Sequence, residues 1–100
     1  MYELSNVSIV IVSFNSEEKL FELFPSIPER CELIIVNNAS NSLPEELKNL
    51  RNFIEIHNSE NKGFGTACNI GVTKASKDFI FLLNPDTFLK DHCLENLLKV

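Results

Sequence analysis

The sequence predicts an α/β fold built on a mainly parallel sheet. Four short apolar runs occur at residues 7–14, 31–36, 53–56 and 79–83, and β-branched residues are frequent in the first two. Segments with the apolar spacing of amphipathic helices separate these runs. Strands that alternate with helices form βαβ units with right-handed crossovers, which predicts a parallel sheet.

The four expected strands differ in character. The first two are apolar on both faces, as in central strands of a parallel sheet. The third is shorter and alternates, so we expect it nearer an edge. The fourth, Phe-Ile-Phe-Leu-Leu, has the length of a buried strand and must end by Pro85, since proline cannot donate to a sheet ladder.

Helices are expected between and after the strands. Ser16, followed by two glutamates, is typical of a helix cap with acids in the first turn, and Pro25 and Pro28 close that helix. Pro44 suits the first turn of a short second helix. The leucines expected on the apolar sides of the first, second and last helices are Leu20, Leu23, Leu43, Leu47, Leu50, Leu94, Leu97 and Leu98.

A third helix follows a loop predicted over residues 58–65. Gly63 and Gly65 would give this loop backbone freedom. Ala67, Gly71 and Ala75 then form a narrow face of small residues, which predicts a helix that lies close to the sheet.

Composition bounds the class of protein. The chain has 100 residues, 44% of them hydrophobic and 23% charged, which is typical of one small globular domain. The net charge of -5 argues against nucleic acid and anionic membrane surfaces as partners. It leaves nucleoside diphosphates open, because a divalent cation and backbone amides commonly hold them.

Targeting and redox signals are few. Cys31, Cys68 and Cys93 form no Cys-x-x-Cys pair, so we expect reduced, mostly buried thiols in a cytoplasmic protein. No signal peptide or membrane span is expected, because there is no apolar leader and no apolar run of about 18 residues. The chain stops inside its last predicted helix, and we therefore expect an N-terminal piece of a longer protein.

Polar clusters follow three strand ends, at residues 14–15, 37–40 and 84–86. The carboxyl ends of parallel strands share one edge of the sheet, where such folds bind ligands, so the clusters should converge there. A fourth cluster, at residues 61–65, opens a helix whose amino end would point the same way and attract phosphate. Asp86 alone could either cap the next helix or hold a metal or sugar hydroxyl.

Four segments together resemble inverting family-2 glycosyltransferases. Residues 7–15 resemble the opening strand that ends in Thr/Ser-Tyr/Phe-Asn, and residues 34–40 resemble the Val-Asp-Asn-x-Ser segment. Residues 61–71 are similar to Asn-x-Gly-Phe-Gly-x-Ala-x-Asn-x-Gly. Residues 82–87 are similar to the Leu-Asn-Pro-Asp form of the Asp-x-Asp motif, common in the rhamnosyltransferase-like branch.

The resemblance implies a GT-A fold, with a three-layer Rossmann-like nucleotide-binding half and sheet order 3-2-1-4. Residues 1–100 would be the N-terminal donor-binding part of the catalytic domain, without the acceptor half. The implied activity is inverting hexosyl transfer from a nucleoside-diphosphate sugar to a glycan acceptor, with Mg2+ or Mn2+, in polysaccharide synthesis. The full-length protein would be cytoplasmic or peripheral at the inner membrane.

The resemblance also implies site residues. Phe14 and Asn15 would line the base and ribose pocket, Asn38 would contact the base, and Lys62 and Gly63 would lie near the nucleotide. Asp86 would coordinate the metal that bridges the diphosphate.

The sequence departs from the family pattern at two positions. Asn37 replaces an acid, and its amide could bind base or ribose without charge. Asn84 replaces the earlier carboxylate of the metal motif, which leaves Asp86 as the only nearby acid, because Asp91 lies too far along the chain. We expect weak metal binding without nucleotide.

The catalytic base lies downstream of Asp86 in this family, so no residue here is assigned to it and the fragment should be inactive in transfer. His57 and His92 are expected to be surface residues.

Two alternatives remain: a non-catalytic nucleotide-sugar-binding or interaction module, and a different doubly wound nucleotide-binding protein. The second alternative is less favoured, because the chain has neither a Gly-x-Gly-x-x-Gly turn nor a Walker motif. We also expect self-association through the open edge of the fourth strand or through the last helix.

Overall fold

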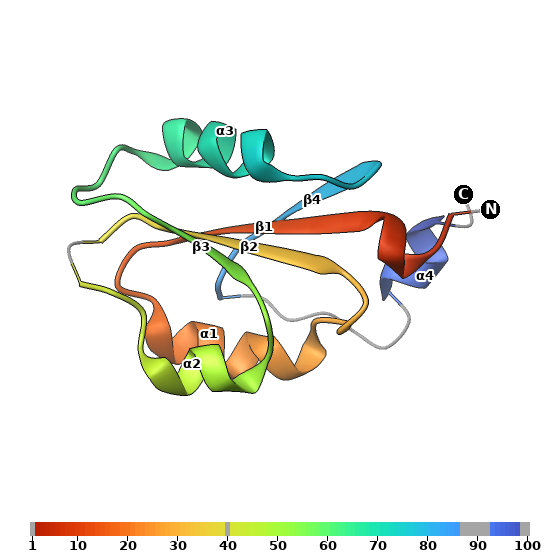
Figure 1. Cartoon of the computed structure of the whole chain (residues 1–100), viewed down its shortest axis with the longest axis horizontal. Helices are drawn as coiled ribbons and strands as arrows, with labels where there is room; N and C mark the ends of the chain where they lie inside the picture. Colours follow the sequence, from red (N-terminus) through yellow and green to blue (C-terminus); the bar gives the residue numbers. More distant parts are fainter. Residues whose placement is uncertain (1, 40, 87–92, 99–100) are drawn as a thin grey trace.

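The computed structural model describes residues 2–39, 41–86 and 93–98. Its four strands form one parallel sheet in the order β3-β2-β1-β4, as predicted (Figure 1). The strands are β1 (Val7–Ser13), β2 (Glu32–Asn37), β3 (Ile54–His57) and β4 (Phe79–Leu83). The helices are α1 (Glu17–Leu23), α2 (Glu45–Leu50), α3 (Phe64–Lys74) and α4 (Cys93–Leu98), with 3-10 turns η1 (Leu4–Asn6) and η2 (Phe24–Ser26). Each of the first three strands differs from its predicted bounds by one residue, at one end or at both.

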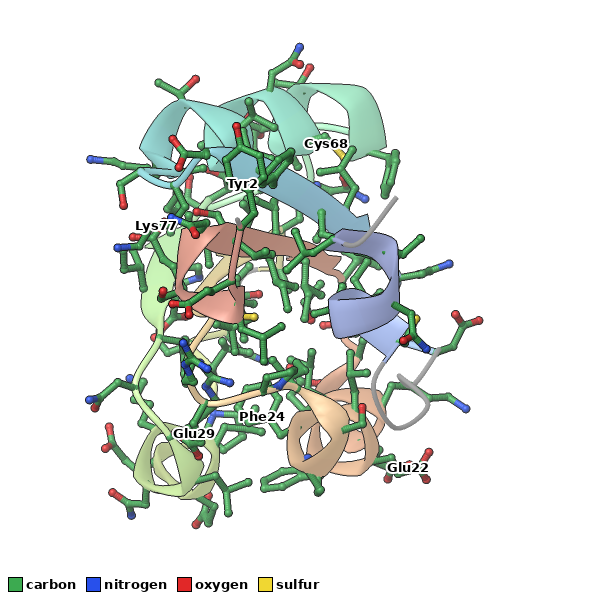
Figure 2. All side chains as sticks on the ribbon, turned by 90° about the vertical axis from the view of Figure 1, so that its right-hand side faces the viewer. Tyr2, Glu22, Phe24, Glu29, Cys68 and Lys77 are labelled. Atoms are coloured by element: carbon green, nitrogen blue, oxygen red, sulfur yellow. The ribbon has the colours of Figure 1, made fainter. Side chains whose placement is uncertain are left out.

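The fold has three layers. Helices α1 and α2 lie on one face of the sheet and α3 lies on the other (Figure 1). The larger core fills the space under α1 and α2, where Ile9 and Ile35 from the sheet and Leu20 from α1 are fully buried. Phe24, labelled in Figure 2, lies in this layer with its ring edge-to-face against Phe53 at 5.6 Å. Burial of these apolar side chains supplies most of the driving force that holds the layers together.

Helix α3 lies very close to the sheet, as its small residues predict. Ala67 is fully buried in a second, smaller core with Val10 and Val36. A Cβ added at Gly71 would overlap Cγ1 of Val10 and lie 3.0 Å from Cγ2 of Val36. Only glycine therefore fits at this point of helix–sheet contact.

The preceding loop ends earlier than predicted, because α3 begins at Phe64. Gly65 is therefore helical, and the expectation of loop freedom at Gly65 is wrong. Gly63 does need the backbone freedom of glycine, since its φ of +85° lies where residues with a side chain are strained.

The fourth strand is less buried than its apolar run suggests, and it presents the open apolar edge that the sequence analysis expects. Phe79, Ile80 and Leu82 of β4 are 39%, 41% and 53% exposed. The physical reason is coverage: β4 is the last strand of the described sheet, and α3 packs on β1 and β2. Tyr2 covers only the start of β4, with its ring edge-to-face on Phe79 at 4.5 Å.

Three smaller expectations are also corrected. Leu50 and Leu97 were expected on the apolar sides of their helices but are 52% and 51% exposed. These short helices turn only one side toward the core, and that side is occupied by Leu47 of α2 and by Leu94 and Leu98 of α4. Ser16 does precede α1, yet its hydroxyl makes no cap hydrogen bond and donates instead to the Phe14 carbonyl at 3.0 Å.

The cysteines agree with the sequence prediction. None of them forms a disulfide among the described residues, and Cys31 and Cys68 are buried. Burial of Cys68, a residue of α3, raises the pKa of its thiol. Among the described residues, no helix is long and apolar enough to cross a membrane.

Candidate functional site

A cleft of about 400 Å³ opens at the carboxyl edge of the sheet. The segments after β1, β2 and β4 and the start of α3 all contribute to it. Its lining residues are Val12, Phe14, Ser16, Lys19, Asn38, Asn61, Phe64, Asn84, Pro85 and Asp86. The four polar clusters of the sequence do converge, because the strands are parallel and end at one edge.

Three of the predicted site residues line this cleft directly: Phe14, Asn38 and Asp86. Phe14 is 53% exposed although it is a large aromatic, and Asp86 is exposed. Across the cleft, Phe64 at the first position of α3 is 66% exposed. Neither phenyl ring packs on another aromatic ring among the described residues, so both rings offer an exposed aromatic surface to the cleft.

Asn38 is the organising residue of the cleft floor. Its side-chain oxygen accepts hydrogen bonds from the Asn58 amide at 2.9 Å and the Lys62 backbone N–H at 3.2 Å. Its side-chain nitrogen donates to Oδ1 of Asn61 at 2.9 Å and to the Gly63 carbonyl at 3.4 Å. These four bonds satisfy a side chain that is only 2% exposed, and they fasten loop 58–63 to the end of β2.

Lys62 and Gly63 adjoin the cleft without lining it. Both contact Asn38 through their backbones, and the Gly63 N–H also donates to Oδ1 of Asn61 at 2.8 Å. The exposed Lys62 side chain makes no ion pair with any residue that the structure describes. Their place in this loop keeps them near whatever the cleft binds.

Asn15 lies beside the cleft at the turn from β1 into α1. Its φ of +51° is in the left-handed region, which asparagine tolerates better than most residues. Its side chain is exposed and does not line the cleft. Asn15 therefore directs Phe14 and Ser16 toward the cleft through its backbone.

Asn37 is placed away from the cleft, on the α1–α2 face of the sheet. It is fully buried, and its amide nitrogen donates to the Asn41 carbonyl at 2.8 Å and to Oε2 of Glu55 at 3.2 Å. Its amide oxygen accepts from the Ala39 N–H at 3.3 Å. In this conformation its polar atoms hold the loop after β2.

His57 does not line the cleft. His57 ends β3 and is exposed, as expected, with Nε2 donating to the Ala39 carbonyl at 2.8 Å. His92, Asp91, Thr87 and Ser40 lie outside the described residues.

The described residues of the cleft supply only part of the ligand set that a divalent cation needs. Asp86 supplies one exposed carboxylate, and no group of three or more His, Cys, Asp or Glu side chains that could hold a metal occurs in the described ranges. Mg2+ is commonly held by one or two carboxylates together with substrate phosphates and water. Asp86 is thus compatible with a cation that arrives with a phosphorylated ligand.

Sequence reasoning missed Lys19 and Phe64 as lining residues. Lys19 follows Ser16 by three residues, so the two share one side of the helix start. Phe64 belongs to the family motif at residues 61–71, but only its 66% exposure at the start of α3 distinguishes it from a core residue. The Asn38 network was also missed, because its partners lie 20 to 25 residues away.

Comparisons with known proteins agree with this arrangement. The sequence model of "Glycosyl transferase family 2" matches residues 8–100. A poly-beta-1,6-N-acetyl-D-glucosamine synthase of Staphylococcus aureus (strain COL) is 28% identical over 95 residues, which cover 87% of this chain and 23% of that protein.

Two solved structures share the fold. TarS 1–349 of S. aureus superimposes with a TM-score of 0.81 at 21% identity, covering 94% of this chain and 31% of that chain. The mannosyltransferase PcManGT from Pyrobaculum calidifontis, solved in complex with GDP-Man and Mn2+, gives a TM-score of 0.80 at 16% identity over 94% of this chain and 31% of that chain.

The chain belongs to glycosyl transferase family 2 and has the α/β architecture of GT-A enzymes. It spans about a quarter of the length of the curated relative and a third of the two solved chains. Membership removes the alternative of a different doubly wound nucleotide-binding protein.

Proposed function

We propose that this chain is the donor-binding part of an inverting, metal-dependent glycosyltransferase. The observation that carries the proposal is the cleft, in which Phe14, Asn38 and Asp86 come together from three different strand ends. The family match and the structural likeness to a mannosyltransferase in complex with GDP-Man and Mn2+ support a nucleoside-diphosphate sugar as the ligand.

The nucleobase is proposed to bind between Phe14 and Phe64. Both rings are exposed in the cleft and free of aromatic partners among the described residues. Base–aromatic stacking is worth about 1–3 kcal/mol per base, and it tolerates any base. Asn38 would set the spacing of the two walls, because it ties loop 58–63 to β2. Asn15, Lys62 and Gly63 would then act mainly through the backbone geometry around that floor, and Asn37 would act through its side chain, which holds the loop after β2.

Asp86 is proposed to hold Mg2+ or Mn2+ against the diphosphate. The cation, when bound, would offset negative charge on the leaving diphosphate. With a single acidic side chain in the described cleft, most of its ligands would come from the donor and water, so metal and donor should bind together.

The general base and the acceptor site are proposed to lie in parts of the enzyme beyond these 100 residues. The chain alone should therefore bind the donor without transferring sugar. The acceptor is proposed to be a growing glycan and the sugar a hexose, in the cytoplasm or at the inner face of the membrane; the polysaccharide-synthase relative supports this reading.

Calorimetry with UDP, GDP and dTDP sugars, with and without Mn2+, tests the proposal. We expect one nucleotide class to bind, and Mn2+ to raise its affinity by roughly 10-fold or more. Asp86→Asn should abolish the Mn2+ effect. Asp78→Asn, at the other end of β4, is the matched control and should retain the effect. Absence of binding by all three classes would contradict the proposal.

A non-catalytic nucleotide-sugar-binding or interaction module is the second candidate. Two substitutions favour it: Asn37, whose amide is committed to Glu55, and Asn84 in place of an acid. Under this alternative, donor binding would be indifferent to both Mn2+ and Asp86. Sugar transfer by the full-length enzyme would decide against it.

A further inference from the structure

Lys19 occupies a defined position on the wall of the cleft. Its neighbour Leu20 and, one turn on, Leu23 are fully buried, so α1 is fixed against the sheet. Ser16 and Lys19 are three residues apart and both line the cleft. The anchored helix thus holds the base of the lysine side chain at the cleft, across from the segment after β4.

Lys19 is also the only cationic side chain among the described residues that line the cleft. Both arginines are engaged elsewhere: Arg30 pairs with Glu3 at 3.2 Å, and the Arg51 guanidinium donates to the Cys31 carbonyl at 2.9 Å. Lys62 is exposed near the cleft, but its side chain does not line it. Lys19 is exposed and makes no ion pair within the described ranges. Its charge is therefore available to a ligand.

The electrostatic need for such a charge is clear. The chain carries a net charge of -5, and Asp86 adds a carboxylate to the described cleft. A diphosphate entering this field is repelled unless positive charge is close by. With Asp86 as the single acidic side chain in the described cleft, a divalent cation is held weakly until the donor arrives. Lys19 is then the permanent positive charge among the described residues that line the cleft.

We propose that Lys19 binds the diphosphate of the donor from the α1 side of the cleft and lets the nucleotide bind partly without metal. This inference rests on the proposed function and adds a specificity residue to it. A lysine ammonium donates up to three hydrogen bonds to phosphate oxygens and serves as a point charge there. No bond is made or broken in this step.

The test compares nucleoside monophosphate and diphosphate binding at low and high salt, in the metal-free chain. Lys19→Gln should weaken diphosphate binding by about 5- to 20-fold and flatten its salt dependence, as expected for loss of one charge-assisted contact. Monophosphate binding should fall by less. Lys19→Arg should restore most of the affinity. Lys74→Gln, an exposed lysine in the last turn of α3, is the matched control and should bind as the unmodified chain does.

The outcomes separate the two claims. If the unmodified chain binds a nucleotide and Lys19→Gln binds it equally well, with the same salt dependence, the role of Lys19 is overturned and the proposed function stands. Equal losses for monophosphate and diphosphate would mean a structural role and would also overturn it. If the unmodified chain binds no nucleotide with or without Mn2+, both claims fail.

Discussion

The side-chain amide of Asn37, at the end of β2, donates a hydrogen bond to the carboxylate of Glu55 on β3 across 3.2 Å. The same carboxylate accepts from the Leu43 N–H at 3.4 Å and lies 3.7 Å from Nζ of Lys48. One buried amide and one acid thus hold the loop between β2 and α2. Where the family pattern has an acid, this chain has a neutral partner for an acid on the next strand.

Asn37→Asp should destabilise the fold, because it replaces a donor with a second carboxylate facing Glu55. Loss of a buried hydrogen bond with a charged partner predicts a decrease of about 1–3 kcal/mol in the free energy of unfolding. Urea denaturation at neutral pH measures this. The loss should shrink at acidic pH, where protonation of either carboxyl group removes the repulsion.

The double variant Asn37→Asp/Glu55→Gln is the control for that mechanism. It restores one donor and one acceptor across the same strand pair, so most of the lost stability should return. A single variant as stable as the unmodified chain would show that the Asn37–Glu55 contact is not what selects asparagine.

Gly71→Ala should destabilise the fold through overlap with Val10 and Val36 beneath α3. Overpacking of a close helix–sheet contact costs about 1–3 kcal/mol, because the helix must move outward. Gly65→Ala is the matched control in the same helix. No atom lies within 4 Å of its added Cβ, so the change should be neutral or stabilising by up to about 1 kcal/mol. Equal effects in thermal unfolding would contradict the close approach.

The converging clusters were predictable because they depend on local chain patterns, whereas the sheet order was implied by the resemblance to family-2 glycosyltransferases. Apolar, β-branched runs identify β1 and β2, and parallel geometry alone brings Phe14, Asn38 and Asp86 to one edge. An open edge at β4 was expected from the implied strand order, but the 53% exposure of Leu82 was not, because an apolar strand does not reveal what covers its faces. The side-chain hydrogen bonds of Asn37 and Asn38 were equally unpredictable, since most of their partners are distant in sequence.

Glu32→Gln should lower stability at neutral pH and lose its effect in acid. Burial raises the pKa of Glu32, but hydrogen bonds from the Ser8 hydroxyl at 2.6 Å and from Ser76, with the charge of Lys77, outweigh it and hold the pKa below 4.5. A lowered folded-state pKa contributes stability above pH 4.5, and this contribution is lost as pH falls through the lowered value.

The difference in unfolding free energy should be roughly 1 kcal/mol at pH 7, since Glu32 is partly exposed. Urea denaturation across the acidic range measures it, with Glu60→Gln, an exposed loop acid, as the control. A gap between Glu32→Gln and the unmodified chain that stays constant below pH 4.5 would exclude linkage to this carboxyl group.

The 100-residue chain should self-associate through β4. This strand is an edge of the described sheet, and it presents unpaired backbone groups beside Ile80 and Leu82, which are 41% and 53% exposed. A second copy can pair with such an edge in antiparallel register and bury the same apolar residues. Leu82→Lys places a charge in that surface and should shift the chain toward monomer in sedimentation velocity.

Leu50→Lys is a close control, because Leu50 is 52% exposed on α2, away from β4, and should leave association unchanged. A monomeric unmodified chain at high concentration would overturn the prediction, and equal responses of both variants would place the contact elsewhere.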